Sequence, residues 1–493
     1  MMMAETDYEQ KHLLQGEREE EDERRRNDGQ MPNDSEVVGA QAYVSVAILC
    51  FVNLLNYVDR YTIAANLGDI QRSFRISNNN SAAGLIQTVF IVGYMLTSPL
   101  FGYLGDRYSR KLIIASGITV WSALTLAGSF VSDDRFWLFV LVRAFVGVGE
   151  ASYVTIAGTI IGDLFVGNRR SQMLMVFYFA IPVGSGLGYI AGSAVATWFH
   201  DWRFALRFTP IFGIVCVFLI ICVLKEPQRG QAETSNQPMS NTDYLADLKA
   251  LTKNKSYISS SLGLTAQCWV IGALSLWAVK TIEYAYTLQG FDNGNVSYIF
   301  GALTCFAGFA GVGLGTSSAQ YVRQYNPRAD PLVCAFGMLC GTPFLFLGIY
   351  VADSQVTVAW IFILIAETLL FLNWALIPDI LLYVLIPTRR ATGNAIQMLM
   401  SHLLGDALSP WIIGFISDRI RNGMSAPSSI HDQYYSLVYS LYIGCFVTAL
   451  GGGFFLMTAL FVVEDKQRVE KIVASTRAMN GGALEGNSVD EDR

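Results

Sequence analysis

The chain has 493 residues, of which 52% are hydrophobic, and its mean hydropathy is +0.38. A soluble globular protein of this length does not tolerate so much apolar surface, so the composition excludes that class. The formal net charge of −6 comes from the ends: residues 1–40 hold 12 acids and 5 bases, residues 464–493 hold 7 acids and 5 bases, and the 24 bases and 21 acids between them give +3. These bases lie in short loops between apolar runs, so we expect no nucleic-acid partner and no cofactor.

Residues 1–41 form an acidic segment that we expect to be a solvated cytosolic tail. It contains no apolar stretch, so the first span is expected to act as the insertion signal. Within it, Glu9-Gln-Lys-His-Leu13-Leu14 resembles an acidic dileucine sorting signal. Glu9, Leu13 and Leu14 therefore predict recognition by adaptor proteins and residence in late endosomes or lysosomes, with the plasma membrane as the alternative.

Twelve apolar runs are long enough to cross a bilayer as helices, which takes about 20 residues each. They are 43–67, 82–104, 112–132, 136–164, 171–198, 203–224, 257–284, 294–322, 331–352, 356–386, 392–420 and 434–463. A polar segment at 225–256 separates the first six from the last six. The sequence thus predicts an all-α membrane protein with a six-helix bundle at 42–224, a cytosolic linker at 225–256, a second bundle at 257–463 and a cytosolic tail at 464–493.

The distribution of basic residues predicts the orientation. Connections on the side of the N-terminus carry roughly twice as many Lys and Arg residues as those on the other side, which places both termini in the cytosol. Two glycosylation sequons, beginning at Asn79 and Asn295, fall in loops on the outer side.

Two spans carry charges that are costly in hydrocarbon and persist where they pair or face a wet cavity. Asp59 and Arg60 lie in the first span, and Arg143 and Glu150 lie on one face of the fourth. Counting from the outer ends places the two groups at similar depth. They form either a static ion pair between the spans or a network in a cavity, where arginine binds an anionic headgroup and a carboxylate takes up a proton.

Internal repetition relates the two bundles. A mid-span acid, a second acid and an arginine pair recur as Glu150, Asp163, Arg169-Arg170 and as Glu367, Asp379, Arg389-Arg390. A second repeat joins Gly102-Tyr-Leu-Gly-Asp106-Arg107 to Gly414-Phe-Ile-Ser-Asp418-Arg419. We expect a cytosolic gate from the charged residues that end the second and fourth spans. Its members are Gly102, Asp106, Arg107, Arg110, Lys111, Asp163, Arg169 and Arg170.

Three further features of the sequence suggest contacts whose role the sequence alone does not decide. His402 and Asp406 lie one turn apart in the eleventh span. They form a helix-packing hydrogen bond or a second titratable or substrate-contacting point; an enzymatic dyad would lack a nucleophile or metal ligand. Gly184, Gly188 and Gly192 predict close helix packing or a sliding interface between the halves. Lys280 with Glu283 predicts a snorkelling pair at the outer end of the seventh span.

Several motifs carry a resemblance to known families. Gly102-Tyr-Leu-Gly-Asp106-Arg107-Tyr-Ser-Arg110-Lys111 resembles the loop signature of the major facilitator superfamily. The region 42–463 resembles the Spinster family of lysolipid transporters, on motifs that include Asn53-Leu-Leu-Asn56-Tyr57-Val-Asp59-Arg60, Gly147-Val-Gly149-Glu150-Ala-Ser-Tyr153 and Ser401-His402-Leu-Leu-Gly-Asp406. The resemblance implies a major-facilitator fold of two pseudo-symmetric bundles with a central cavity.

The resemblance also implies transport by alternating access. The expected substrate is a lysolipid, with lysophospholipid moved from lysosome to cytosol and protons as coupling ion; the alternative is export of sphingosine-1-phosphate at the plasma membrane. The family's polar residues match at Asp59, Arg60, Arg143 and Glu150, and His402 and Asp406 are further candidates. The chain is expected not to be an enzyme and to contact membrane lipids. The rivals from other classes are a polytopic lipid-modifying enzyme and a receptor on a transporter fold.

Overall fold

A computed structural model describes residues 40–165, 167–227, 244–386 and 389–490. Twelve of its helical segments are long and apolar enough to cross a membrane. Helices suit this environment because they satisfy every backbone polar group internally. The predicted spans are confirmed to within a few residues, except at the C-terminus.

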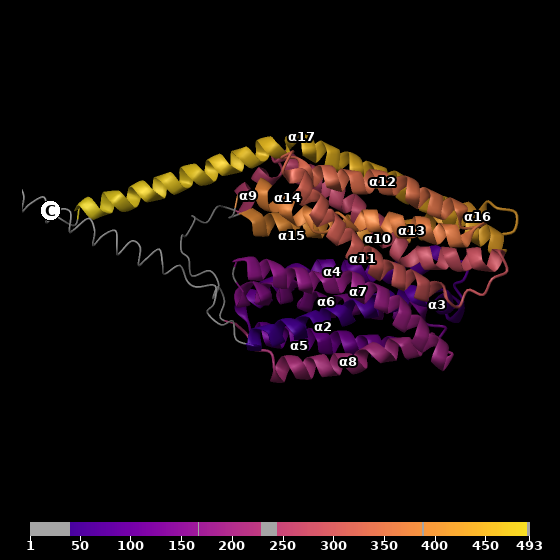
Figure 1. The fold of residues 1–493 in the computed structure, drawn as a ribbon. Coiled ribbons are helices and arrows are strands. Elements are labelled where there is room, and N and C mark those ends of the chain that lie inside the picture. The colour runs from indigo at the N-terminus through magenta and orange to yellow at the C-terminus, as the bar shows by residue number, and fades with distance from the viewer. Residues whose placement is uncertain (1–39, 166, 228–243, 387–388, 491–493) are drawn as a thin grey trace, which may run out of the picture.

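The N-terminal half contains six long helices and one short one. They are α2 (Ala40–Ala65), α3 (Leu67–Ser73), α4 (Asn80–Arg107), α5 (Arg110–Gly128), α6 (Phe136–Leu164), α7 (Gly167–Phe199) and α8 (Trp202–Cys222). We call the face at which α2 begins the proximal face and the opposite one the distal face. Figure 1 shows these helices as one layer of the molecule, running side by side between the two faces.

The C-terminal half forms the other layer (Figure 1). It contains α10 (Lys255–Leu288), α11 (Val296–Arg323), α12 (Ala329–Val351), α13 (Val356–Phe371), α14 (Leu376–Val384), α15 (Arg390–Ser401), η2 (His402–Asp406), α16 (Ser409–Asn422) and α17 (Ile430–Asp490). The short α9 (Tyr244–Leu251) precedes it. Helices α7 and α11, and α4 and α16, pack against each other across the seam between the halves.

Two spans of the C-terminal half depart from a regular α-helix. Between α13 and α14, the Gln267 side chain of α10 donates to the Leu370 carbonyl at 3.1 Å and accepts from the Asn373 side chain at 3.1 Å. An interrupted helix is tolerated at membrane depth when neighbouring groups satisfy its backbone in this way. The eleventh span contains the π-helical turn η2, in which the Ala407 amide bonds the His402 carbonyl.

The segment after residue 463, predicted as a cytosolic tail, is helical. Helix α17 continues to Asp490 and projects beyond the bundle at the proximal face (Figure 1). Its polar part begins with Glu464, Asp465 and Arg468, and the Arg468 guanidinium lies 3.0 Å and 3.3 Å from the two carboxylates. Asp465 is buried and also accepts from the Ser256 amide and hydroxyl of α10, at 3.0 and 2.7 Å, so the first polar turn is fixed both by pairs along the helix and by the bundle.

Glycine spacing in α7 serves packing within one half. A Cβ atom at Gly188 would lie 2.9 Å from the Val58 carbonyl of α2, and one at Gly184 would lie 2.8 Å from the Leu54 carbonyl. Both helices belong to the N-terminal half, so these glycines fix two backbones at close approach. The sliding interface between halves that the spacing also allowed is not formed by this face of α7.

Candidate functional site

The four charged residues of the first and fourth spans meet inside the N-terminal half as two separate ion pairs. In the first, Arg143 Nη1 of α6 lies 3.5 Å from Asp59 Oδ2 of α2. The same carboxylate accepts hydrogen bonds from Trp121, Thr125 and Thr209, at 3.2, 3.4 and 2.6 Å. Both charged side chains are buried. Asp59 therefore has a full set of donors from α5, α6 and α8, as a structural ion pair would.

In the second pair, Arg60 Nη2 lies 3.1 Å from Glu150 Oε2, and both residues are buried. The guanidinium carbon lies 5.0, 4.9 and 5.7 Å from the ring centres of Tyr57, Phe90 and Tyr94, respectively. Arginine is attracted to aromatic faces, so the rings hold the cation in place without neutralising it.

The two pairs differ in how well their carboxylates are satisfied. Among the residues that the structure describes, Glu150 Oε1 is buried and has no hydrogen-bond partner, and both arginines keep buried donors without partners, namely Arg60 Nε and Arg143 Nε and Nη2. Buried polar atoms without partners are rare and mark strain or a place for a ligand. The Arg60–Glu150 pair can therefore take an anionic group on the arginine and a proton on the carboxylate, whereas the carboxylate of Asp59 is already satisfied.

His402 and Asp406 are brought together in the second half. Their side chains lie 3.0 Å apart, from His402 Nδ1 to Asp406 Oδ2, and both are partly exposed. They sit on η2, which contacts α4 across the seam and packs at Gly405 against the backbone of Thr265 and Trp269. A π-helical turn inside an α-helical span is frequent at functional sites. The predicted contact is confirmed; its position on a π-turn could not be read from the spacing.

Glu367 is a half-buried acid that the repeat indicated but that was not predicted as a site residue. Its Oε1 accepts from Thr304 Oγ1 at 3.4 Å, and its Oε2 has no partner within the described part of the chain. The side chain lines an apolar pocket together with Leu274, Phe300 and Leu345. The signal was its correspondence with Glu150 in the repeat, which places a mid-span carboxyl in each half.

At the proximal face, two of the predicted gating residues form an ion pair: Arg110 Nη1 lies 2.6 Å from Asp163 Oδ2. The sequence analysis missed Glu226, which caps the first turn of α5. It accepts from the Arg110 amide and the Ser109 hydroxyl, each at 2.8 Å. Partial burial by itself would raise the pKa of Glu226, but these bonds and the Arg110 charge lower it below its ordinary value.

The other predicted gating residues are less engaged. Arg107 is exposed and stacks on the Tyr103 ring at 4.5 Å, and Arg169 is also exposed. The Arg170 guanidinium packs over Gly162, and the Lys111 amide lies 3.5 Å from Glu226 Oε2. Gly102 has open space beside it. The side chain of Asp106 lies outside the described residues, as do Glu9, Leu13 and Leu14.

The expectation for Lys280 and Glu283 is wrong. Lys280 is 3% exposed, so it does not snorkel towards the surface. Its ammonium group instead bonds the Gln71 side chain of α3 and lies 3.4 Å from Asn80 Oδ1 of α4. The prediction failed because it considered one helix alone, whereas the N-terminal half covers this end of α10.

The halves separate towards the proximal face. A pocket of about 420 Å³ lies between α7 and α11, lined by Met175, Phe179, Gly313 and Ser317 among others. At the distal end, in contrast, α3 and α4 contact α10 and α16 directly. Two helical bundles packed along a seam, with buried charges at membrane depth, define a membrane transporter of the solute-carrier class.

Comparisons with known proteins agree with this class. A model of the Major Facilitator Superfamily matches residues 49–410. Protein spinster homolog 1 of Xenopus tropicalis is 54% identical, over 86% of this chain and 82% of its own length. Protein spinster homolog 3 of Danio rerio is 46% identical over 91% of both chains, and the sphingosine-1-phosphate transporter SPNS2 of Xenopus tropicalis is 48% identical over 87% and 83%. The chain therefore belongs to the Spinster family of the major facilitator superfamily, and it is a multi-pass membrane transporter and not an enzyme.

A solved structure shares the fold. The bacterial homolog of the human lysosomal transporter Spinster, in an inward-facing and unoccupied conformation, has a TM-score of 0.75 and 18% identity, covering 87% of this chain and 99% of its own. The predicted fold of two six-helix bundles is confirmed.

Proposed function

We propose that this transporter moves a lysolipid by alternating access, taking lysophospholipid from the lysosome to the cytosol with protons as coupling ion. The observation that carries the proposal is the Arg60–Glu150 pair, which is buried in the apolar interior yet leaves Arg60 Nε and Glu150 Oε1 without partners. A phosphate group satisfies the free donors of an arginine.

The coupling follows from charge balance. A phosphate that binds Arg60 competes with Glu150 for the guanidinium, and an uncompensated buried carboxylate costs about 3 to 5 kcal/mol. Substrate binding therefore favours a proton on Glu150, and substrate release favours its loss, so that the two fluxes are linked reciprocally. The full set of donors around Asp59 favours Glu150 over Asp59 as the proton site.

The apolar pocket beside Glu367 is small, about 40 Å³. Its lining is almost wholly hydrocarbon, from α10 to α13 and α17, but it has no room for an acyl chain, so the support for an amphipathic substrate comes from the relatives. Sphingosine-1-phosphate combines the same phosphate and chain, and SPNS2 of Xenopus tropicalis, which is 48% identical, is named for its transport. Export of that lipid at the plasma membrane is therefore the second candidate.

Purified protein in proteoliposomes tests the substrate directly. We expect labelled lysophospholipid to cross the bilayer chemically unchanged, faster than in protein-free vesicles, with sphingosine-1-phosphate as the second arm. Transport of only the latter would select the second candidate. Chemical conversion of either lipid, or no flux of both, would overturn the proposal.

The proposal also places the proximal face in the cytosol. Asn79 and Asn295 are exposed on the distal face, so both are open to glycosylation in the lumen. Treatment with a glycosidase should increase the gel mobility of the wild type but not of Asn79→Gln/Asn295→Gln. Equal mobility of all samples would contradict glycosylation at these two sites.

A further inference from the structure

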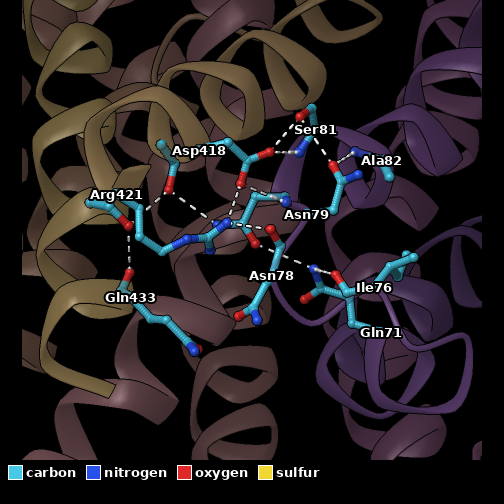
Figure 2. Close-up of polar contacts among 12 residues, drawn as sticks. Gln71, Ile76, Asn78, Asn79, Ser81, Ala82, Asp418, Arg421 and Gln433 are labelled. Atoms are coloured by element: carbon cyan, nitrogen blue, oxygen red, sulfur yellow. Dashed lines mark hydrogen bonds and ion pairs between the residues drawn. The ribbon is translucent and has the colours of Figure 1, made fainter. Parts of the chain in front are cut away.

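At the distal end of the seam, one carboxylate makes several of the bonds between the halves. Asp418 of α16 uses both of its oxygens on the N-terminus of α4 in the other half (Figure 2). Oδ1 accepts from the Asn80 amide at 2.9 Å and Oδ2 accepts from the Ser81 amide at 2.7 Å. The Ser81 hydroxyl also donates to Oδ2. The first amides of a helix have no partner within it, and a negative charge at that end is favoured by the helix dipole.

Arg421, one turn further along α16, holds this carboxylate in place. Its Nη2 lies 2.7 Å from Asp418 Oδ1 and donates to the Asn78 carbonyl at 2.5 Å (Figure 2). The side chain is 2% exposed, so the bonds are made out of contact with water. Arg421 therefore orients Asp418 and itself bridges the two halves.

The backbones around these groups are in direct contact. A Cβ atom at Gly414 of α16 would lie 2.3 Å from the Asn80 carbonyl, and one at Gly84 of α4 would lie 2.4 Å from the Pro410 carbonyl. At these two contacts the backbones leave no room for a side chain between the helices. Opening the distal end requires every bond from Asp418 to α4 to break.

We propose that Asp418 is the latch of the distal gate, and that its bonds to Asn80 and Ser81 set the population of the state that is closed at this face. The inference rests on the alternating access in the proposed function but not on the identity of the substrate. In the repeat, Asp418 corresponds to Asp106 at the other face.

Cysteine labelling in lipid nanodiscs tests the latch, because both faces are then open to a membrane-impermeant maleimide. Ala83 of α4 is 0% exposed and packs with the core of the C-terminal half, so Ala83→Cys reports opening of the distal seam. The native Cys216 and Cys334, each buried within one half, report loss of the fold. Labelling at each position is followed by mass spectrometry, with the chain lacking the introduced cysteine as background.

We expect Asp418→Asn to raise the labelling rate of Ala83→Cys about tenfold, which corresponds to about 1.4 kcal/mol in the opening equilibrium. Ser81→Ala removes the hydroxyl bond and also the sequon that begins at Asn79, so all samples are deglycosylated before labelling; this variant should then give a smaller rise. Cys216 and Cys334 should stay unlabelled in both. Asp133→Asn is the matched control, since Asp133 lies at the same face but bonds Ser73 and Arg203 within one half.

The proposal is overturned if Ala83→Cys is labelled at the wild-type rate in Asp418→Asn, or if Asp133→Asn raises it equally. A second result also overturns it. In this result, Asp418→Asn leads to labelling of the native Cys216 and Cys334 as well as of the cysteine introduced at position 83, while Ser81→Ala has no effect on labelling. If the protein moves no lysolipid but shows the expected labelling, the latch is supported and only the proposed substrate is contradicted.

Discussion

The Asp59 carboxylate accepts a hydrogen bond of 2.6 Å from the Thr209 hydroxyl of α8, deep inside the N-terminal half. Together with Trp121 and Arg143, this contact makes Asp59 the point at which four helices of one bundle are tied together. Arg60, the next residue, bonds instead to Glu150. Two neighbouring charges of one span thus have different surroundings, and substitutions at the two positions should have different effects.

Asp59→Asn should lower stability. Neutralising Asp59 leaves the Arg143 charge buried without a counter-ion, and removing one member of a buried ion pair costs about 3 to 5 kcal/mol. Thr209→Val removes a single neutral donor and should cost about 1 kcal/mol. Thermal unfolding of the purified protein in detergent measures both. An Asp59→Asn protein as stable as the wild type would show that the Asp59–Arg143 pair is not structural.

Arg60→Ala and Glu150→Gln should instead abolish lysolipid flux while the protein still folds. Each substitution leaves one buried charge unpaired and so lowers stability as Asp59→Asn does, but fewer hydrogen bonds to other helices are lost, and the charge that the pair offers to a substrate disappears. Flux in proteoliposomes, normalised to the amount of folded protein, measures the effect. Retention of near-wild-type flux by both variants would mean that this pair, too, is structural.

The cap formed by Glu226 should contribute stability that depends on pH. Its pKa in the folded protein is lowered from the ordinary value of 4.5. A carboxylate whose pKa is lowered by folding stabilises the folded protein at pH values above its pKa in the unfolded state. This stabilisation is lost as the pH falls through its pKa in the folded state. Glu226→Gln should therefore be less stable than the wild type at pH 7, by about 1 kcal/mol, and the difference should shrink as the pH falls below 4.5 and vanish below the folded-state pKa. A difference independent of pH would contradict a role for the ionised carboxylate.

Sequence patterns predicted the fold and most residues of the candidate site. They did not predict which of these residues pair with each other. Apolar run length located twelve spans because the bilayer sets one length for all of them. The depth of Asp59 and Arg143 could be counted along each helix, so their contact was predictable. Which carboxylate bonds which arginine depends on helix rotation, which the sequence does not state. The role predicted for Lys280 was wrong, and Glu226 was not predicted at all, because the partners of both residues come from segments distant in the sequence.

The dileucine motif should direct the protein to late endosomes or lysosomes. Leu13→Ala with Leu14→Ala removes the side chains that an adaptor binds, so a tagged double variant should move to the plasma membrane. Lys11→Ala lies within the same motif but changes none of its defining positions, and should leave the distribution unchanged. Fluorescence colocalisation with a lysosomal marker measures the shift. A wild-type protein already at the cell surface would favour sphingosine-1-phosphate export.

Flux should depend on a proton gradient that is acid on the distal side, and Glu150 should be the group that confers this dependence. The carboxylate loses its only ion-pair partner when a phosphate takes Arg60, and a proton then removes the uncompensated charge. His402 is the rival site, because an imidazole changes charge in the range between lysosomal and cytosolic pH and this one faces Asp406 at 3.0 Å.

Lysolipid flux is measured in proteoliposomes with and without the imposed gradient, for the wild type, Glu150→Gln and His402→Ala. In the wild type the gradient should raise the flux several-fold, and in Glu150→Gln any residual flux should no longer respond to it. His402→Ala should keep the response. If only His402→Ala loses it, the proton site lies in η2, and if the wild type itself is indifferent to the gradient, transport is facilitated diffusion without a coupled proton.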